Sequence, residues 1–229
     1  MIVFDNVWLR YHYDEFDLLK GASFSLVDGV NTVLCDYQSG KSSICKLLIR
    51  DFSPSNGRIF LDGQDVASIT NANLDILYLP AKPAFFERRS VLYNVQYPLA
   101  LRKVPKAERF AQAKQVAIEL GVEDLNAKVK SLPTNERRRV ALARGLTVKR
   151  KTVLFDDFFE NNAQVDASLN LFSGATCVIF TSNPTLARGN VVVLDGGVAV
   201  YQGNAEGARA LVEQLGWLAN EDLVNETRS

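Results

Sequence analysis

Short apolar runs separated by turn-forming residues recur along the chain and predict a succession of β-strands. Runs that are apolar throughout are typical of buried strands, whereas clusters of Asp, Asn, Gly and Pro mark where strands end. The sequence predicts strands at residues 3–4, 24–27, 30–34, 58–61, 76–79, 152–155, 177–181 and 191–194. Asp28-Gly29 is predicted to form a hairpin-type turn between the second and third of these strands.

Helical signals fall between the predicted strands. One helix is expected to follow Gly40-Lys41 and to end near Arg50, and two others are expected at residues 107–120 and 135–147. No strand is indicated between residues 105 and 130, so this region is expected to be an inserted helical subdomain. Buried strands separated by helices indicate an α/β fold with a parallel core.

The composition allows one domain with a substantial core and a small subdomain, because 47% of the 229 residues are hydrophobic. Lysine plus arginine and aspartate plus glutamate number 26 each, which gives no reason to expect nucleic-acid binding. No apolar stretch is long enough to span a membrane, and the first residues lack the order of a signal peptide. The three cysteines have no metal-like spacing, so a cytosolic protein with reduced thiols is expected.

Residues 35–43 carry the clearest chemical signal. They place Gly40-Lys41-Ser42 between a predicted buried strand and a predicted helix, which is the context of a phosphate-binding loop. In such a loop the helix N-terminus faces an anion, Lys41 reaches the terminal phosphates and the Ser42 hydroxyl binds Mg²⁺. The usual pattern begins with a glycine where this chain has Cys35, so one flexible position of the loop is lost.

Asp156 is the candidate for a second group that organises Mg²⁺. It directly follows the apolar run at residues 152–155, and phosphate-loop NTPases carry a metal-organising carboxylate at the end of such a strand. The alternative is that Asp156 caps the N-terminus of a helix that follows the strand.

In their order, these segments resemble an ATP-binding cassette (ABC) ATPase, the nucleotide-binding subunit of membrane transporters. The resemblance covers about residues 2–204 and includes the segments LDGQDV at 61–66, SVLYNV at 90–95, RVALAR at 139–144 and LDGG at 194–197. The spacing fits without a gap from Leu132 to Asp156, which argues against a third interpretation, an unrelated nucleotide kinase.

The resemblance implies a phosphate-loop NTPase with a mixed sheet core, an antiparallel β subdomain and an inserted helical subdomain. Its implied nucleotide-binding domain extends over residues 1–220, with the helical subdomain at about 82–147, and residues 221–229 form a polar C-terminal tail.

The implied cofactors are ATP and Mg²⁺. Tyr11 stands where the family stacks an aromatic ring on adenine. Tyr13 is a second candidate for this role, and the alternative for Tyr11 is a strand tyrosine on the surface. His12 is interpreted as a surface residue. The implied nucleotide-binding residues are Tyr11, Gln38, Ser39, Gly40, Lys41, Ser42 and Ser43, and the implied metal ligands are Ser42 and Asp156.

Several family positions that support hydrolysis hold other residues. Asp157 stands where the family has its water-activating glutamate, and as a candidate base it is one methylene shorter. Ala81 replaces a glutamine and Ser182 replaces a histidine, and neither side chain can supply the lost contacts. Phe158 replaces the proline that normally follows the glutamate. Whether Glu160 or Asp166 compensates for the lost catalytic carboxylate is left open by the sequence.

The segment Leu132-Pro133-Thr134-Asn135-Glu136 occupies the place of the family signature, normally Leu-Ser-Gly-Gly-Gln. In the family this segment contacts the γ-phosphate of ATP bound to the opposite subunit. Here Pro133 has no N–H to donate, and Glu136 adds a negative charge. The segment is therefore interpreted as an ordinary first turn of a helix that has lost its role as a clamp.

The leading expectation is a degenerate ABC ATP-binding subunit that hydrolyses ATP weakly or not at all on its own. It is expected to work with transmembrane subunits and with a second ABC ATPase subunit, in a homo- or heterodimer, and to lie at the cytoplasmic face of a membrane only through these partners. Residues 91–101 resemble the face on which the family docks its membrane subunit, with a core edge as the alternative. The second interpretation is a pseudo-ATPase that no longer needs nucleotide and serves as a structural or regulatory interaction module.

Overall fold

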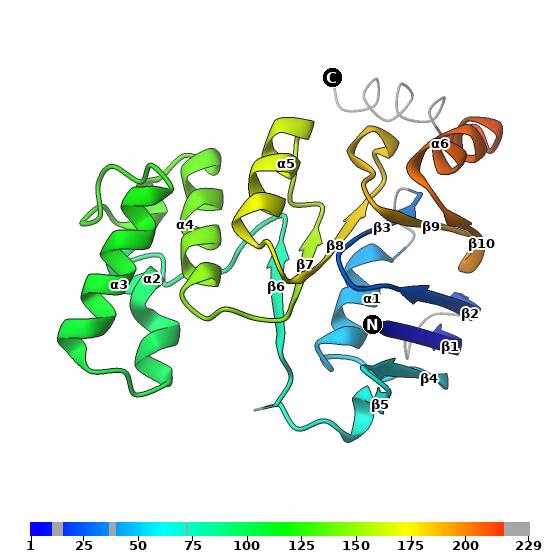
Figure 1. Ribbon diagram of the computed structural model, residues 1–229, viewed down its shortest axis with the longest axis horizontal. Coiled ribbons are helices and arrows are strands. Elements are labelled where there is room, and N and C mark those ends of the chain that lie inside the picture. Colours follow the sequence, from blue (N-terminus) through cyan, green and yellow to red (C-terminus); the bar gives the residue numbers. More distant parts are fainter. Residues whose placement is uncertain (11–15, 37–39, 72, 218–229) are drawn as a thin grey trace.

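The computed structural model describes residues 1–10, 16–36, 40–71 and 73–217. These residues form two β-sheets, six α-helices and three short 3₁₀ turns (Figure 1). The strands are β1 (Ile2–Arg10), β2 (Asp17–Leu26), β3 (Val30–Cys35), β4 (Asn56–Leu61), β5 (Gln64–Asp65), β6 (Ile76–Pro80), β7 (Thr152–Asp156), β8 (Thr176–Thr181), β9 (Asn190–Asp195) and β10 (Val198–Gly203). The helices are α1 (Lys41–Leu48), α2 (Val91–Leu101), α3 (Lys106–Glu119), α4 (Thr134–Leu146), α5 (Asn162–Leu171) and α6 (Ala205–Gln214), with 3₁₀ turns η1 (Val66–Ser68), η2 (Val129–Ser131) and η3 (Pro184–Leu186).

The larger sheet has the order β10-β9-β3-β8-β7-β6, and all its neighbouring strands are parallel except the edge pair β9 and β10. The smaller sheet is antiparallel, in the order β2-β1-β4-β5. The predicted α/β fold, with a mixed sheet core and an antiparallel β part, is thus confirmed.

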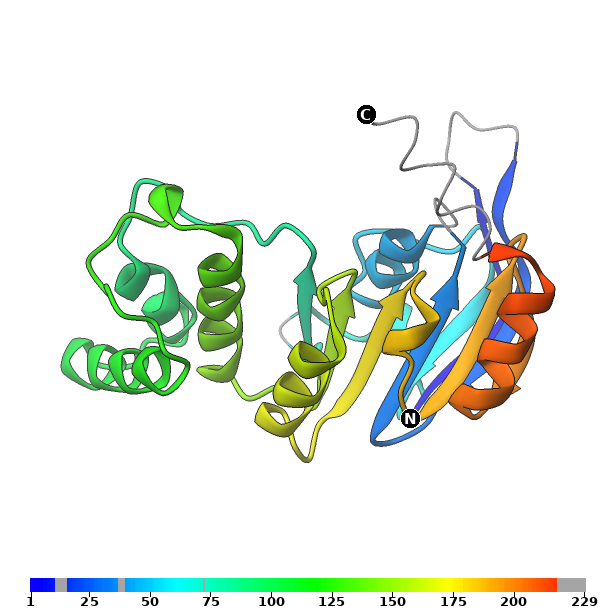
Figure 2. The same ribbon diagram turned by 90° about the horizontal axis from the view of Figure 1, so that it is seen from above.

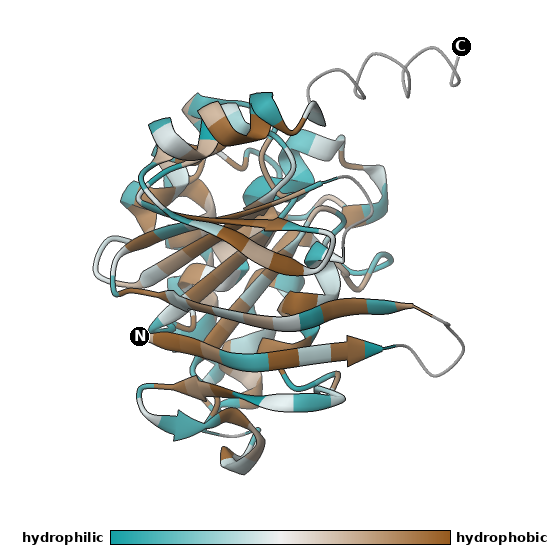
Figure 3. Ribbon diagram, turned by 90° about the vertical axis from the view of Figure 1, so that its right-hand side faces the viewer, coloured by the Kyte–Doolittle hydropathy of each residue, from teal (hydrophilic) through white to brown (hydrophobic). Residues whose placement is uncertain are grey.

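Helix α1 lies between the two sheets. Its buried apolar residues Ile44, Leu47 and Leu48 belong to one core cluster with side chains from the antiparallel sheet and from the parallel strands. Figure 3 shows that hydrophobic residues predominate in the parallel strands and alternate with hydrophilic residues along the antiparallel strands. Because α1 starts directly after the loop that follows β3, this packing fixes the position of the helix N-terminus relative to both sheets.

The predicted hairpin at Asp28-Gly29 is wrong, because the two strands that it joins belong to different sheets. Strand β2 pairs with β1, whereas β3 pairs with β8 and β9 in the middle of the parallel sheet. Five of the six residues of β3 are buried, which fits its place as a central strand of this sheet. The Asn31 side chain stabilises the crossing by hydrogen bonds to the backbone N–H and carbonyl of Val27, at 2.8 and 2.7 Å.

Helices α2, α3 and α4 gather at one end of the molecule, away from the antiparallel sheet (Figures 1 and 2). They share a separate apolar core that includes Val91, Val95, Ala113 and Val140. Helix α4 also packs on the parallel sheet through Ala141 and Leu142, so it joins the two regions. The helices predicted at 107–120 and 135–147 are present as α3 and α4, and the boundary of a helical subdomain at 82–147 stays a prediction.

Within the described ranges, the structure contains no helix that combines the length and the apolar character required to cross a membrane. The predicted polar tail at residues 221–229 lies outside the described residues.

Candidate nucleotide-binding site

The candidate residues meet at the carboxyl ends of the parallel strands. Strand β3 ends at Cys35 and leads toward α1, while Asp156 ends β7 and lies opposite Pro80 of β6 and Phe180 of β8. Ligands of open α/β sheets bind at this edge, because loops and helix N-termini converge there. The predicted contacts Gln38 and Ser39 lie outside the described residues, as does Tyr11 with its neighbours His12 and Tyr13.

Gly40 sets the direction in which α1 begins. Its φ angle is 85°, and its carbonyl accepts hydrogen bonds from the N–H groups of Ser43 and Ile44 at 2.8 and 3.1 Å. A Cβ at this position would lie 2.4 Å from Leu18 Cδ2, so a side chain would collide as well as strain the backbone. The first turn of α1 has no acidic residue and no side-chain cap. Its N–H groups and helix dipole therefore favour an anion as partner.

The next three residues of the loop differ in exposure. Lys41 is 7% exposed and Ser43 is 4% exposed, whereas Ser42 is exposed to solvent at the start of the helix. Lys41 is a buried cation, which requires an anionic partner. The structure thus places a positive charge, a hydroxyl and a helix N-terminus together.

Asp157 supplies the anionic partner of Lys41 in this structure. Its Oδ2 lies 3.5 Å from Lys41 Nζ, and its backbone N–H donates to the Phe180 carbonyl at 2.9 Å. Partial burial raises the pKa of the Asp157 carboxyl above its ordinary value, while the Lys41 ammonium acts in the opposite direction and the Asp156 carboxylate adds to the rise. The candidate base is therefore engaged with the phosphate-loop lysine.

Asp156 is almost fully buried, with 3% of the residue exposed. Its Oδ2 accepts a hydrogen bond from the Tyr78 hydroxyl at 2.7 Å, while its buried Oδ1 has no hydrogen-bond partner among the described residues. Carboxylate oxygens are preferred ligands of Mg²⁺. The orphaned oxygen, with the exposed Ser42 hydroxyl on the first turn of α1, fits a magnesium ion at this edge of the sheet.

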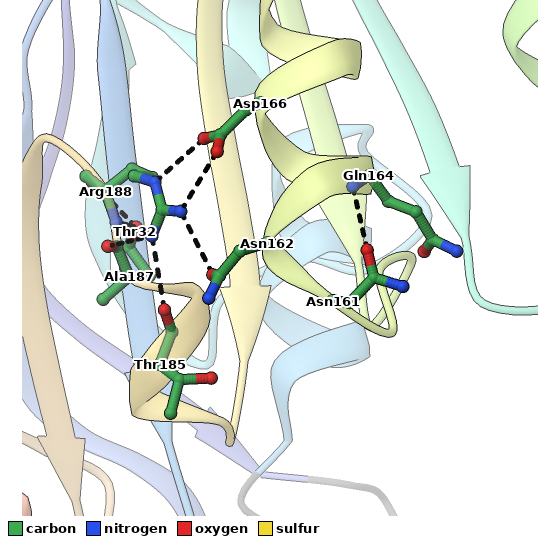
Figure 4. A network of polar contacts seen from close by, with 8 residues as sticks. All are labelled: Thr32, Asn161, Asn162, Gln164, Asp166, Thr185, Ala187 and Arg188. Atoms are coloured by element: carbon green, nitrogen blue, oxygen red, sulfur yellow. Dashed lines mark hydrogen bonds and ion pairs between the residues drawn. The ribbon is translucent and has the colours of Figure 1, made fainter.

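The alternative role of Asp156 as a helix cap is wrong. Helix α5 begins six residues beyond the end of β7, and its N-cap is Asn161, whose side chain accepts a hydrogen bond from the Gln164 N–H at 3.0 Å (Figure 4). Asp156 therefore does not cap α5, and its carboxylate lies at the candidate site instead.

Tyr78 is a site residue that the sequence analysis missed. Burial and its hydrogen bond to Asp156 raise the pKa of the Tyr78 phenol far above its ordinary value, so the hydroxyl remains a donor. The sequence carried no signal for this contact, because it depends on the register of β6 and β7, which places Tyr78 and Asp156 in neighbouring strands on the face toward α1.

The two carboxylates considered as substitutes for the shortened base have other partners. Glu160 Oε1 lies 2.5 Å from Arg138 Nη1, and Asp166 Oδ1 lies 3.1 Å from Arg188 Nε. Figure 4 shows the Arg188 side chain extending from the β8–β9 connection to α5, where it also donates to the Asn162 side chain at 3.1 Å. Both carboxylates thus form ion pairs that stabilise the surroundings of the site.

The other residues that differ from the family pattern are Ala81, Ser182 and Phe158, and each follows the end of a parallel strand. Ala81 directly follows β6, and the half-buried Ser182 directly follows β8. Phe158 is buried in an aromatic cluster, with ring centroids 5.8 Å from Phe155 and 5.4 Å from Phe159. A proline at this position would leave that cluster without one ring, so Phe158 serves the core.

The segment at 132–136 forms the start of α4. Pro133 is the N-cap, Thr134 begins the helix, and Asn135 Oδ1 accepts from the Glu136 N–H at 2.9 Å. Pro133, Thr134 and Asn135 are all exposed. The segment is therefore a helix N-terminus on the surface, as predicted, with side chains where the family signature has glycines.

Comparisons with known proteins agree with this geometry. The family model described as ABC transporter matches residues 19–160. The Molybdate/tungstate import ATP-binding protein WtpC of Pyrococcus horikoshii is 33% identical over 151 residues, which cover 65% of this chain and 44% of that protein. The Fe(3+) ions import ATP-binding protein FbpC of Pasteurella multocida is 37% identical over 142 residues, which cover 60% of this chain and 39% of that protein. The match thus spans less than half the length of these relatives.

A solved structure shares the fold over nearly the whole chain. It is a bacterial Atm1-family ABC exporter with ATP bound, superimposed with a TM-score of 0.76 over 96% of this chain and 42% of that chain. Its sequence identity is 24%, so this likeness concerns the fold alone.

Proposed function

Because the chain belongs to the ABC transporter family, we propose that it is a transporter's ATP-binding subunit, which binds Mg-ATP through Lys41, Ser42 and Asp156. The family binds ATP together with Mg²⁺. Two observations carry the proposal together: Lys41 is buried at the N-terminus of α1, and the buried Oδ1 of Asp156 at the end of β7 has no hydrogen-bond partner among the described residues.

Each proposed ligand has a separate task at the site. The N–H groups of the first turn of α1 and Lys41 bind phosphate oxygens, and Ser42 and Asp156 hold the cation. Bound Mg²⁺ neutralises charge on the phosphate groups and polarises them. Gly40 fixes the start of the helix, because its carbonyl accepts the first helical hydrogen bonds, from the N–H groups of Ser43 and Ile44.

Hydrolysis by this chain alone is proposed to be weak. Asp157 contacts Lys41 and is shorter than a glutamate, while Ala81 and Ser182 cannot contribute the polar contacts of the residues that they replace. Loss of a general base costs about 10²–10⁴-fold in rate, and loss of one charge-stabilising donor about 10²–10³-fold. These factors do not multiply independently, but turnover is expected to be well below about 1 s⁻¹.

The proposed partners are transmembrane subunits and a second ATP-binding subunit with complete catalytic residues. Helix α2 supports the first of these: Phe86, which is 43% exposed, packs its ring against Tyr93 and Tyr97 on this helix at centroid distances of 5.5 and 4.6 Å. Import is the proposed direction, because the names of the relatives reported above refer to import. The proposed location is the cytoplasmic face of a membrane, reached through the partners.

A nucleotide-independent module is the second candidate. The ion pair between Lys41 and Asp157 favours it, because the buried lysine already has an anionic partner without a phosphate. Nucleotide binding would have to replace this contact.

Calorimetric titration with Mg-ATP separates the two candidates. Lys41→Ala removes the ammonium at the N-terminus of α1, whereas Lys46→Ala is a matched control in the last turn of the same helix, where Lys46 Nζ lies 4.9 Å from the Phe52 ring centroid. We expect micromolar binding by the unaltered chain and by Lys46→Ala. Lys41→Ala should lose at least 100-fold in affinity for Mg-ATP, which corresponds to about 2.7 kcal/mol of binding free energy. Absence of binding by the unaltered chain would overturn the proposal and favour the interaction module.

A further inference from the structure

The hydrogen bond between Tyr78 and Asp156 follows from the register of two parallel strands. Tyr78 of β6 lies opposite Leu154 of β7, and Pro80 lies opposite Asp156. Tyr78 and Leu154 both pack against the core that contains α1, so this face of the two strands is the one toward the helix. Because side chains alternate along a strand, Asp156 projects on the same face as Leu154. A tyrosine ring is long enough to reach a diagonal neighbour, and its hydroxyl contacts Asp156 Oδ2 at 2.7 Å.

The two oxygens of Asp156 are therefore not equivalent. Oδ2 is the acceptor of the phenol, while Oδ1 is buried without a hydrogen-bond partner in the described part of the chain. A carboxylate can rotate about its last torsion, which is broad for Asp. A donor fixed in a neighbouring strand removes that freedom and selects which oxygen faces an incoming ligand.

Resting on the function proposed above, we infer that Tyr78 is a positioning residue for the cation site. It holds Oδ2 of Asp156 so that Oδ1 is the oxygen offered to a divalent cation. Tyr78 itself contacts neither nucleotide nor metal. Partners that orient metal-binding carboxylates contribute about 10–100-fold to metal affinity in other proteins, which sets the expected size of the effect.

A purely structural role for the same hydrogen bond predicts something different. Buried tyrosine hydroxyls commonly need a partner, and Asp156 satisfies that need whether or not metal binds. A structural role would change stability, or would weaken nucleotide binding equally with and without metal. Only a positioning role makes the loss specific to the cation.

The test compares Tyr78→Phe with Tyr201→Phe. Both substitutions keep the ring and remove one hydroxyl donor, and the Tyr201 hydroxyl donates to the Asn204 carbonyl at 3.1 Å, away from the site. Mn²⁺ affinity is measured from the electron paramagnetic resonance signal of free Mn²⁺, with a saturating non-hydrolysable ATP analogue. Affinity for the same analogue is measured separately in EDTA.

We expect Tyr78→Phe to weaken Mn²⁺ binding by about 10–100-fold, while its metal-free affinity for the analogue stays within about twofold of the unaltered chain. Tyr201→Phe should leave both quantities unchanged. A loss of folded protein would lower the stoichiometry of binding and not the affinity, so the readout does not depend on full recovery of the variant.

Equal Mn²⁺ affinity in Tyr78→Phe and the unaltered chain would overturn the inference and leave the proposed function standing. A parallel loss with and without metal would also overturn it in favour of a structural role. If the unaltered chain binds no metal with nucleotide present but still binds the analogue in EDTA, the cation site itself is overturned. If it binds neither, the proposed function is overturned together with the inference.

Discussion

Gly40 is the residue of the phosphate loop whose identity the backbone decides most directly. Its φ angle of 85° is in the left-handed region, and Leu18 fills the space that a Cβ would need. The pattern Gly-Lys-Ser signalled this position in the sequence, because its glycine has a fixed place before the helix. Tyr78 was not signalled in this way, since its role depends on a register between strands that are distant in sequence. Motif residues could therefore be predicted, and their supporting contacts could not.

Gly40→Ala should be more damaging than the same change at a glycine with equal backbone strain but free space. Gly63 has a φ angle of 81°, and a Cβ at this position would meet no atom within 4 Å, so Gly63→Ala measures the backbone strain alone, about 1–2 kcal/mol. Gly40→Ala adds the displacement of Leu18, for which about 1–3 kcal/mol is typical of overpacking. Urea unfolding of both variants checks the difference. Equal losses would show that Leu18 moves aside at no cost.

At the scale of elements, long buried strands and periodic helices could be predicted, whereas elements defined by their partners could not. All five residues of strand β7 are buried and its three central residues are apolar, and it was predicted almost to its ends. Helix α5 was not predicted, because only Val165 and Ser168 of its residues are buried and its apolar stripe is therefore short. The wrong hairpin at Asp28-Gly29 has the same origin: the turn signal was correct, but pairing across sheets is a tertiary property.

Arg188 connects α5 to the β8–β9 connection by polar contacts, which supplement the few buried residues of this helix. Its guanidinium contacts Asp166 and Asn162 of α5 and the carbonyls of Thr185 and Ala187 (Figure 4). We expect Arg188→Ala to lower the free energy of unfolding by about 1–3 kcal/mol, because charged groups lose hydrogen bonds. Arg139→Ala, which removes an exposed arginine with one bond to the Gly121 carbonyl at 3.2 Å, should cost within about 0.5 kcal/mol. Denaturant unfolding of the two variants measures both losses in the free energy of unfolding. Similar losses would mean that the stability of α5 does not depend on Arg188.

The ion pair between Glu87 and Arg137 connects the segment before α2 to α4, with Glu87 oxygens 2.5 and 2.9 Å from the guanidinium. The Arg137 hydrogen bond lowers the pKa of Glu87 below its ordinary value of 4.5. A lowered carboxyl pKa gives stability that is present above the ordinary pKa and is lost as pH falls through the lowered one.

Glu87→Gln should therefore lower the free energy of unfolding at neutral pH, by at most about 1 kcal/mol because the pair is partly exposed to solvent. The difference from the unaltered chain should shrink as pH falls below the ordinary pKa of the carboxyl. Unfolding is measured in urea across the acid range, with Glu123→Gln as the control for loss of one exposed negative charge. A difference that stays constant with pH would contradict the ion pair.

At the scale of the whole molecule, the fold sets two surfaces apart. The carboxyl ends of the parallel strands present Lys41 and Asp156, while α4 presents its own exposed N-terminus at Pro133 and Thr134 some distance along the chain. A resemblance to ABC ATPases implies that these surfaces meet in a dimer, each from a different subunit. The first surface carries the proposed phosphate and metal ligands, whereas in the second Pro133 has no backbone N–H to donate.

Restoring the segment at the start of α4 should therefore restore nucleotide-dependent association. The combined variant Pro133→Ser, Thr134→Gly, Asn135→Gly and Glu136→Gln returns an N–H donor, removes two side chains and removes one negative charge at a helix N-terminus that is exposed and outside the core. With Asp157→Asn added to suppress residual hydrolysis, this variant should change from one chain to two in sedimentation velocity when Mg-ATP is present. Asp157→Asn alone should remain a single chain, and adding Lys41→Ala to the combined variant should abolish association. If the combined variant stays monomeric although calorimetry shows that it binds Mg-ATP, the altered segment is not what prevents pairing, and the obstacle must lie in the surface around the nucleotide.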